Sequence, residues 1–181
     1  YLGLPVQAHI AISGAKSLDA QSGMETGTSL FLGALNRVNV VSGGGGLASG
    51  SSFSLEKLLI DNEICGLAKR LLNGIDPRSE KLAEDLFEVG MFDGDHFLRS
   101  PHTMKWFKEE MHYPGPTISR DNFADWQDKG GTSVEQRARE EVERILSTHQ
   151  PEQLDSDIDR ELLRIITRQA QKYGMSKLPL P

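Results

Sequence analysis

The fold is decided by Leu4-Pro5-Val6-Gln7-Ala8-His9-Ile10, a short and mostly apolar run with a proline at its entrance. Such a run is typical of a strand buried on both faces, as parallel sheets require. A second apolar run, Asn39-Val40-Val41-Ser42, predicts another strand. Each run is followed by a polar or glycine-rich loop and then by a segment with helical spacing. This alternation predicts a parallel sheet with helices outside it.

Two helices are predicted after these strands. The first covers about residues 22–36, where Met24, Leu30, Phe31, Ala34 and Leu35 recur at near-helical spacing. The second follows Ser54, a good N-cap, and ends at Asn73-Gly74. Its apolar face is wide enough to pack against a sheet and consists of Leu55, Leu58, Leu59, Ile64, Leu67, Ala68, Leu71 and Leu72.

The second half of the chain is predicted to be helical. Helices are expected to start at Asp76-Pro77, at Ser100-Pro101 and at a capping box in residues 132–136 that allows two registers. Prolines exclude a helix through residues 112–116. A last amphipathic helix is expected from Asp155 to Tyr173. We expect its inward face to be Ile158, Leu162, Ile165, Ile166 and Ala170.

The predicted sheet is unfinished. Two parallel strands do not form a stable sheet alone, and a complete (β/α)₈ barrel needs about 250 residues, whereas the chain has 181. We therefore expect the remaining strands to lie in sequence outside this chain; the alternative is an unusual, mostly helical domain. Because Tyr1 is neither a methionine nor the start of a charged and then apolar leader, we expect no signal peptide and a natural start upstream.

Composition argues against several classes of partner. The formal net charge is −6 and charges of both signs are interspersed, so no basic stripe predicts nucleic-acid binding and no polybasic run predicts membrane binding. The apolar runs are shorter than the roughly 20 residues of a spanning helix. Cys65 is the only cysteine, which excludes an internal disulfide and favours a reducing, cytoplasmic compartment.

Polar side chains gather after the first predicted strand. His9, Lys16 and Asp19 lie there with Ser13, and Gln21 and Glu25 follow. Sites in parallel α/β proteins form at this edge of the sheet, so we expect at least one of these residues to line a functional cavity. The alternatives are an ion pair or helix cap for Lys16 and Asp19, and a hydrogen-bonded core position for His9.

The glycine run Gly43, Gly44, Gly45 and Gly46 follows the second predicted strand. Its backbone N–H groups could cradle a phosphate, but no lysine follows in the manner of a phosphate-binding loop. We favour a tight turn that lets the backbone approach another loop or a ligand closely.

Other polar and aromatic residues predict structural roles. Asp61 and Glu63 are two apart on a helix and point to different faces, so they do not predict a catalytic pair; a capping or solvated role is expected. We predict no metal site, since Asp93, Asp95, His96, His102 and His112 match no compact zinc spacing. Cys65 is expected to pack within its helix. Packing or an interface is predicted for Trp106, Phe107, Tyr113, Phe123 and Trp126, with closure over a cationic ligand as the alternative.

Several stretches resemble the trimethylamine methyltransferase family of corrinoid-dependent enzymes. The most specific are Ala15-Lys16-Ser17-Leu18-Asp19-Ala20-Gln21-Ser22-Gly23-Met24-Glu25 and, further on, Ser54-Leu55-Glu56-Lys57-Leu58-Leu59-Ile60-Asp61-Asn62-Glu63. Residues 3–6, 43–46, 94–98, 102–103 and 149–151 also look like that family. The resemblance covers nearly the whole chain.

The resemblance implies a (β/α)₈ barrel that holds a methylated amine at its C-terminal mouth, while a separate corrinoid protein presents the Co(I) that receives the methyl group. Residues 1–75 would be the last two βα units of this barrel and residues 76–181 a helical C-terminal extension. Family members with pyrrolysine act on trimethylamine, and relatives without it act on quaternary amines such as glycine betaine. The printed sequence contains no pyrrolysine, which leaves both substrates open.

The leading hypothesis is therefore methyl transfer from a tertiary or quaternary amine to a corrinoid protein. His9, Lys16, Asp19, Glu25 and the glycines Gly43, Gly44 and Gly45 are the candidate substrate-binding residues. Asp93-Gly94-Asp95-His96 departs from the Asp-x-His-x-x-Gly pattern of corrinoid carriers, so cobalamin is expected on a partner and no cofactor on this chain. A homo-oligomer is possible. The rival hypotheses are a non-catalytic module that docks a partner protein and a barrel enzyme that binds a phosphorylated small molecule at the glycine run.

Overall fold

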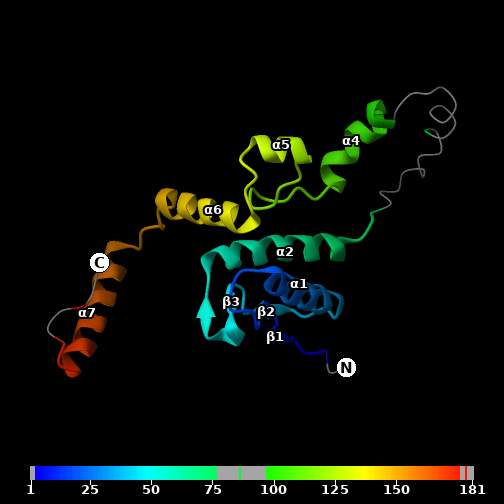
Figure 1. The fold of residues 1–181 in the computed structure, drawn as a ribbon. Coiled ribbons are helices and arrows are strands. Elements are labelled where there is room, and N and C mark those ends of the chain that lie inside the picture. The colour runs from blue at the N-terminus through cyan, green and yellow to red at the C-terminus, as the bar shows by residue number, and fades with distance from the viewer. Residues whose placement is uncertain (1–2, 77–85, 87–96, 176–177, 179–181) are drawn as a thin grey trace. The chain divides into compact units, whose positions relative to one another are not determined.

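A computed structural model of the protein describes residues 3–76, 86, 97–175 and 178 (Figure 1). The chain divides into two compact units, Tyr1–Leu146 and Ser147–Pro181. The first unit contains a small parallel sheet, a short hairpin and most of the helices, and the second contains a single long helix. Each unit is described by itself below.

The two predicted strands exist and pair in parallel. Strand β1 covers Gln7–His9 and strand β2 covers Val40–Ser42, with Ala8 opposite Val41 in the register. The pairing continues beyond β1, where the Ala11 N–H donates to the Ser42 carbonyl at 3.1 Å. The predicted parallel pairing is thus confirmed.

The strands are shorter and more exposed than predicted. Val6 and Val40 are each about half exposed, whereas a parallel pair in a complete sheet is covered on both faces. The expected burial on both faces is therefore wrong for the part of the chain that the structure describes. Membership of a barrel stays a prediction, since two strands define only their own pairing.

Helix α1, Ala20–Leu35, follows β1 and lies against helix α2, Leu55–Asn73 (Figure 1). Asp19 is the N-cap of α1: its side chain accepts from the Ser22 N–H at 3.1 Å, and the Ser22 hydroxyl accepts from the Asp19 N–H at 3.2 Å. This reciprocal pair satisfies two backbone donors that the first turn leaves free. Leu30 is buried, but Met24 and Leu35, which share the predicted apolar spacing, are mostly exposed.

A hairpin that the sequence did not predict follows the glycine run. Strands β3, Gly46–Leu47, and β4, Ser52–Phe53, pair antiparallel around the 3₁₀ turn η1, Ala48–Gly50. Two-residue strands carry too few side chains to show an alternating pattern, so the segment was expected to be only a loop. The hairpin returns the chain to the start of α2.

The ends of α2 were predicted correctly. The Ser54 side chain accepts from the Lys57 N–H at 3.0 Å, and Gly74 closes the helix by donating to the Leu71 carbonyl at 3.1 Å. The predicted apolar face is only partly buried, because Leu58, Leu71 and Leu72 are exposed. The buried residues of α2 are Lys57, Asp61 and Ala68.

The helical second half is confirmed where it is described. Turn η2, Phe97–Arg99, precedes helix α4, Pro101–Glu110, which has Ser100 as its N-cap. Helix α5, Phe123–Asp128, was not predicted. Helix α6, Val134–Thr148, begins with the Ser133–Gln136 register of the capping box. The predicted helix start at Asp76-Pro77 lies outside the described residues, apart from Asp76 itself.

Residues 110–115 are tied to α2. The Arg70 guanidinium donates to the Glu110 carbonyl at 3.1 and 3.2 Å and to its carboxylate at 3.1 Å. These contacts keep residues 110–115 in the same compact unit as the strands. The predicted division after residue 75 concerns the architecture of a longer protein and remains a prediction.

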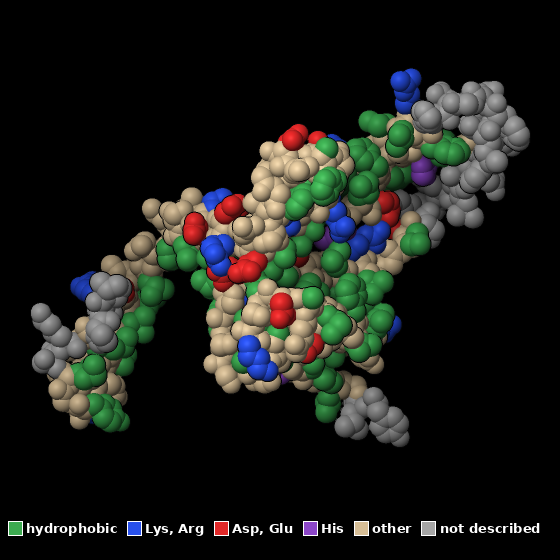
Figure 2. Space-filling model, viewed as in Figure 1, with side chains coloured by type: hydrophobic (Ala, Val, Ile, Leu, Met, Phe, Trp, Pro, Cys, Tyr) green, Lys and Arg blue, Asp and Glu red, His purple; other side chains and the backbone are tan. Residues whose placement is uncertain are grey.

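The second unit contains helix α7, Ser156–Lys172, capped by Asp155. Ile158, Leu162, Ile165 and Ile166 were expected to face inward, but all four are exposed. The amphipathic pattern is correct, yet the expected burial is wrong, because the described residues of this unit form no second element that could cover a face of α7. Figure 2 shows hydrophobic side chains at the surface of each unit. Among the helices described, no stretch has the length and hydropathy to cross a membrane.

Candidate active site

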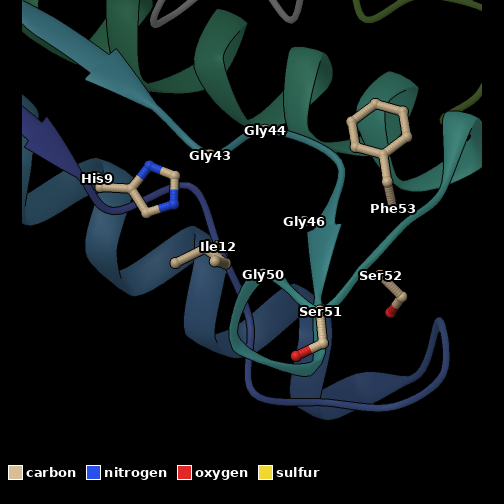
Figure 3. Close-up of a pocket in the computed structure, with 9 residues that line it drawn as sticks. All are labelled: His9, Ile12, Gly43, Gly44, Gly46, Gly50, Ser51, Ser52 and Phe53. Carbon is tan, nitrogen blue, oxygen red and sulfur yellow. The ribbon is translucent and has the colours of Figure 1, made fainter. Parts of the chain in front are cut away.

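A cavity of about 410 Å³ opens at the carboxyl ends of β1 and β2 (Figure 3). Its position agrees with the rule that sites in parallel α/β proteins form beyond the strand ends. The lining residues come from the end of β1, the glycine run and the β3–β4 hairpin. They are His9, Ile12, Gly43, Gly44, Gly46, Gly50, Ser51, Ser52 and Phe53. No lining side chain except His9 is titratable.

His9 is exposed at one wall of this cavity. Its Nδ1 lies 3.1 Å from the Ser42 hydroxyl on the neighbouring strand, which orients the imidazole. The ring lies directly on Gly43: a Cβ at that position would come 3.1 Å from His9 Cε1, closer than ordinary packing allows. Gly43 also has φ +100, where a side chain would be strained. The glycine run thus allows the close approach that the sequence predicted.

Gly45 lies behind the cavity wall and is buried. Its N–H donates to the Asp61 carboxylate at 2.8 Å, and its carbonyl accepts from the Ser54 N–H at 3.0 Å. The Phe53 ring covers it so closely that a Cβ at Gly45 would lie 2.5 Å from Cε2. Figure 3 shows His9 and Ile12 on one side of the glycine run and Phe53 on the other.

The glycine run has few free donors for a phosphate. The Gly45 N–H is bound to Asp61, and the Gly46 N–H donates to the Gly43 carbonyl at 3.0 Å. The geometry therefore does not favour the phosphate alternative.

Glu25 organises the loop after β1 rather than the cavity. Its carboxylate accepts from the Ser13 hydroxyl at 2.7 Å, the Gly14 N–H at 2.7 Å and the Gln21 amide at 2.8 Å. These hydrogen bonds, the one from Ser13 first, lower the pKa of Glu25 below its ordinary value, with a smaller contribution from the charge of Lys16. Glu25 is thus held as an anion that fixes the loop.

The structure brings together only some of the predicted site residues. His9, Gly43 and Gly44 line one cavity, and Gly45 supports it from behind. Lys16 instead donates to the Gly14 carbonyl at 2.8 Å, and Asp19 caps α1. Neither these two residues nor Glu25 belongs to the cavity lining. Of the two alternative interpretations, the structure shows the helix cap for Asp19, whereas Lys16 makes a backbone contact in place of the ion pair.

Sequence reasoning missed Phe53 and the hairpin residues of the lining. An aromatic residue shortly after four glycines was the available signal, because a ring can pack on a backbone that has no side chains. The sequence also missed Lys57 and Asp61, which form a buried ion pair at 2.6 Å. The solvated or capping role expected for Asp61 is wrong, because this side chain is buried and accepts from Lys57 and from the Gly45 N–H.

The other candidate residues have structural contacts. Glu63 accepts from the Gly115 N–H at 3.0 and 3.1 Å. Cys65 packs within α2 as predicted, and its burial raises the pKa of the thiol. The ring centres of Phe123 and Trp126 lie 5.7 Å apart with their planes tilted by 40°, and the Trp126 indole donates to the Thr132 carbonyl at 3.0 Å. Trp126 therefore takes part in packing, as expected, whereas Phe123 is mostly exposed.

Three of the residues weighed as metal ligands, Asp93, Asp95 and His96, lie outside the described part of the chain. Within residues 3–76 and 97–175, no three His, Cys, Asp or Glu side chains gather closely enough to hold a metal ion. The His112 ring packs on Gly66 of α2, where a Cβ would lie 3.2 Å from its Cε1.

Comparison with known proteins gives one consistent result. The sequence model of the trimethylamine methyltransferase (MTTB) family matches residues 1–174. Trimethylamine methyltransferase MttB of Methanosarcina barkeri (strain Fusaro) is 33% identical over 171 residues, 93% of this chain and 33% of the relative. Glycine betaine methyltransferase of Desulfitobacterium hafniense (strain Y51) is 31% identical over 176 residues, 96% of this chain and 36% of the relative.

The chain spans about a third of the length of these curated relatives. The family match nevertheless extends through both βα segments and the helices that follow them. It also includes the cavity at the strand ends and the residues of α2 behind it. The chain belongs to the trimethylamine methyltransferase family.

Proposed function

We propose that this chain is the C-terminal part of an enzyme that moves a methyl group from a tertiary or quaternary amine to the Co(I) of a corrinoid protein. The observation that carries the proposal is the open cavity at the carboxyl ends of two parallel strands in a chain of this family. In a (β/α)₈ barrel this is the face at which active sites form. The rest of the cavity wall would come from strands outside this chain.

The chemistry sets what the cavity must do. The C–N bond breaks, its electron pair stays on nitrogen, and the methyl group passes to the corrinoid, which is a second substrate carried by another protein. An amine leaves readily only when its nitrogen is quaternary or protonated, so the bound substrate is a cation. A cation is stabilised by the faces of aromatic rings in a site from which water is excluded.

The cavity residues suit part of this task. Phe53 supplies an aromatic side chain in the lining, and the imidazole of His9 is held in place by Ser42. The lining contains no lysine or arginine that would repel a cation. In the proposed enzyme His9 positions the amine, or the carboxylate group of a substrate such as glycine betaine. Gly43 and Gly44 allow the substrate or a facing loop to approach the backbone.

Other parts of the proposal follow from the family and from composition. Cobalamin is carried by the partner and is not a cofactor of this chain. The enzyme works in the cytoplasm, a location proposed from the single cysteine of this chain. A homo-oligomer is compatible with this function and is not needed for it. The choice between trimethylamine and a quaternary amine such as glycine betaine is left to experiment.

The test is a methyl-transfer assay with the full-length protein, a reduced corrinoid protein, and either trimethylamine or glycine betaine. Formation of the methylated corrinoid is followed by absorbance, and dimethylamine or dimethylglycine is measured as the product. We expect transfer from one of the two amines. Absence of transfer from these and from other tertiary and quaternary amines would contradict the proposal.

A variant places the reaction in this cavity. His9→Ala is expected to lower kcat/KM by about tenfold or more, the range of a lost positioning contact. His149→Ala is the matched control, because His149 is exposed and lies in the second unit. Equal activity of both variants would show that the reaction takes place elsewhere.

A further inference from the structure

Two buried charges stand behind the glycine run. Lys57 and Asp61 are one turn apart on α2, are 1% and 3% exposed, and place Nζ and Oδ2 2.6 Å apart. Removing two charges from water costs several kcal/mol per ion, so a buried pair is weak evidence of a stabilising role. What the pair contacts is therefore more informative than its attraction.

Lys57 connects three segments of the first unit. Its ammonium donates to the Thr26 hydroxyl of α1 at 3.0 Å and to the Ala11 carbonyl, just after β1, at 3.4 Å. With Asp61 as its third acceptor, each of its N–H groups has a partner. The side chain thus fixes the position of Asp61 relative to both α1 and the end of β1.

Asp61 passes this position on to the glycine run. The same oxygen, Oδ2, accepts from Lys57 and from the Gly45 N–H at 2.8 Å. The Gly45 carbonyl is held by the Ser54 N–H at the start of α2. Both the N–H and the carbonyl of Gly45 are thus held by hydrogen bonds. Its neighbours in the chain, Gly44 and Gly46, line the cavity.

We propose that Asp61 and Lys57 are positioning residues for the active site: through Gly45 they set the conformation of the glycine wall of the cavity and thereby the binding of the amine. The inference rests on the proposed function for its last step only. The clamp itself, Lys57 to Asp61 to Gly45, is independent of the substrate. Neither side chain touches the cavity, so both act through the loop.

Glu63 provides a matched control on the same helix. It is a carboxylate two residues from Asp61, and it also accepts a glycine N–H, that of Gly115. Gly115 is not part of the cavity lining. Glu63→Ala therefore removes the same kind of hydrogen bond from the same element without affecting the glycine run.

The first measurement is hydrogen exchange of peptides covering residues 43–53 in the full-length protein. We expect Asp61→Ala to speed exchange at Gly45 by about tenfold or more, since its N–H loses its acceptor. Asp61→Asn is expected to restore most of the protection, because one amide oxygen can still accept from both Lys57 and Gly45. Glu63→Ala should leave this peptide unchanged. Unchanged exchange in Asp61→Ala overturns the clamp.

The second measurement is the split between KM and kcat for the amine. Asp61→Ala is expected to raise KM by about tenfold, and Asp61→Asn and Glu63→Ala by less than about threefold. Faster exchange together with an unchanged KM overturns the positioning role. A wild-type protein without methyl-transfer activity contradicts the proposed function instead, and the exchange result then still decides the clamp. If Asp61→Ala does not fold, Lys57→Gln replaces it, with the same expected direction in both measurements.

Discussion

Asp61 and Glu63, two positions apart on α2, each accept the backbone N–H of a glycine from a different segment: Gly45 for Asp61 at 2.8 Å, Gly115 for Glu63 at 3.0 and 3.1 Å. Because positions two apart on a helix point in different directions, one helix fixes two loops on two of its faces. Helix α2 thus holds the glycine wall of the cavity on one side and the segment after α4 on another.

Removing the ammonium of Lys57 should destabilise the protein strongly. Lys57→Met leaves the Asp61 carboxylate buried without its partner, and we expect the free energy of unfolding to fall by about 3–5 kcal/mol. The double variant Lys57→Met with Asp61→Leu should recover part of this loss, since both charges are gone. A remaining cost of about 1–3 kcal/mol reflects the unpaired Gly45 N–H.

Urea unfolding of the full-length protein checks this expectation. Glu135→Ala removes a partner of Arg139 at an exposed ion pair and serves as the control; its effect should stay within about 1 kcal/mol. Similar losses for Lys57→Met and Glu135→Ala would show that the buried pair does not contribute to stability in this way.

Gly45→Ala should damage both stability and substrate binding. Gly45 has φ +78, and a Cβ there would lie 2.5 Å from the Phe53 ring. Gly74 also has a positive φ, +62, but no atom of the described residues lies within 4 Å of its Cβ position. Gly74→Ala should therefore cost about 1–3 kcal/mol from backbone strain alone.

Thermal unfolding of the two alanine variants separates strain from collision. Gly45→Ala should lower the free energy of unfolding by more than Gly74→Ala, and it alone should raise KM for the amine. Equal losses in the two variants, with KM unchanged, would mean that Phe53 moves aside easily.

Glu25 predicts a dependence of stability on acid pH. Hydrogen bonds from Ser13, Gln21 and Gly14 lower the pKa of the folded-state carboxyl below its ordinary value of 4.5. A lowered pKa means that the folded protein favours the ionised form of Glu25. The contribution of this carboxylate to stability is therefore fully present at pH values above its ordinary pKa and is lost as pH falls through the folded-state pKa. Glu25→Gln removes it.

The measurement is the difference in unfolding free energy between wild type and Glu25→Gln over a series of pH values. The wild type should be the more stable protein near neutral pH, and the difference should shrink as pH falls below 4.5. Glu152→Gln, at an exposed carboxylate, is the control. A difference that grows with acidity would contradict the assignment.

Arg137 should be needed for the fold of the helical segment. Its guanidinium donates to the Thr117 carbonyl at 2.9 Å and to the Thr132 carbonyl, and so joins two loops that flank α5. Arg137→Lys keeps the charge but loses the planar fork, so we expect the free energy of unfolding to fall by about 1–3 kcal/mol.

Arg139→Lys, at an exposed position, is the control and should change the free energy of unfolding by no more than about 0.5 kcal/mol. Urea unfolding followed by tryptophan fluorescence compares the two variants; equal stability would contradict the role of Arg137.

The parts of the fold that were predicted correctly are those with local causes. Ser54, Ser100 and the Ser133–Gln136 pair begin helices because a side chain binds backbone donors within three residues, which any sequence window contains. The hairpin at residues 46–53 was missed because strands of two residues leave no pattern. Helix α5 was missed because six residues span less than two turns.

The structure has a cavity where the sequence predicted a site, but only some of the predicted residues line it. The rule that polar loops after parallel strands form sites selected His9 and the glycine run, which line or support this cavity. It also selected Lys16, Asp19 and Glu25, whose hydrogen bonds are satisfied within the loop and at the helix cap. Sequence position alone does not distinguish a side chain that faces a cavity from one that completes its own loop.

By itself, the sequence determined the two parallel strands, the longer described helices, the serine caps and the family resemblance, since these depend on local spacing and on motifs. Only the tertiary structure decided that Lys57 and Asp61 are buried beside the glycine run and that Phe53 faces it. The burial of Lys57 and Asp61 depends on α1, α2 and the end of β1 meeting in space, because charged side chains on a helix are otherwise expected in solvent. Spacing along the chain cannot reveal the contact between Gly45 and Asp61, which are 16 positions apart. Nor can it reveal the contact between Ala11 and Lys57, which are 46 positions apart.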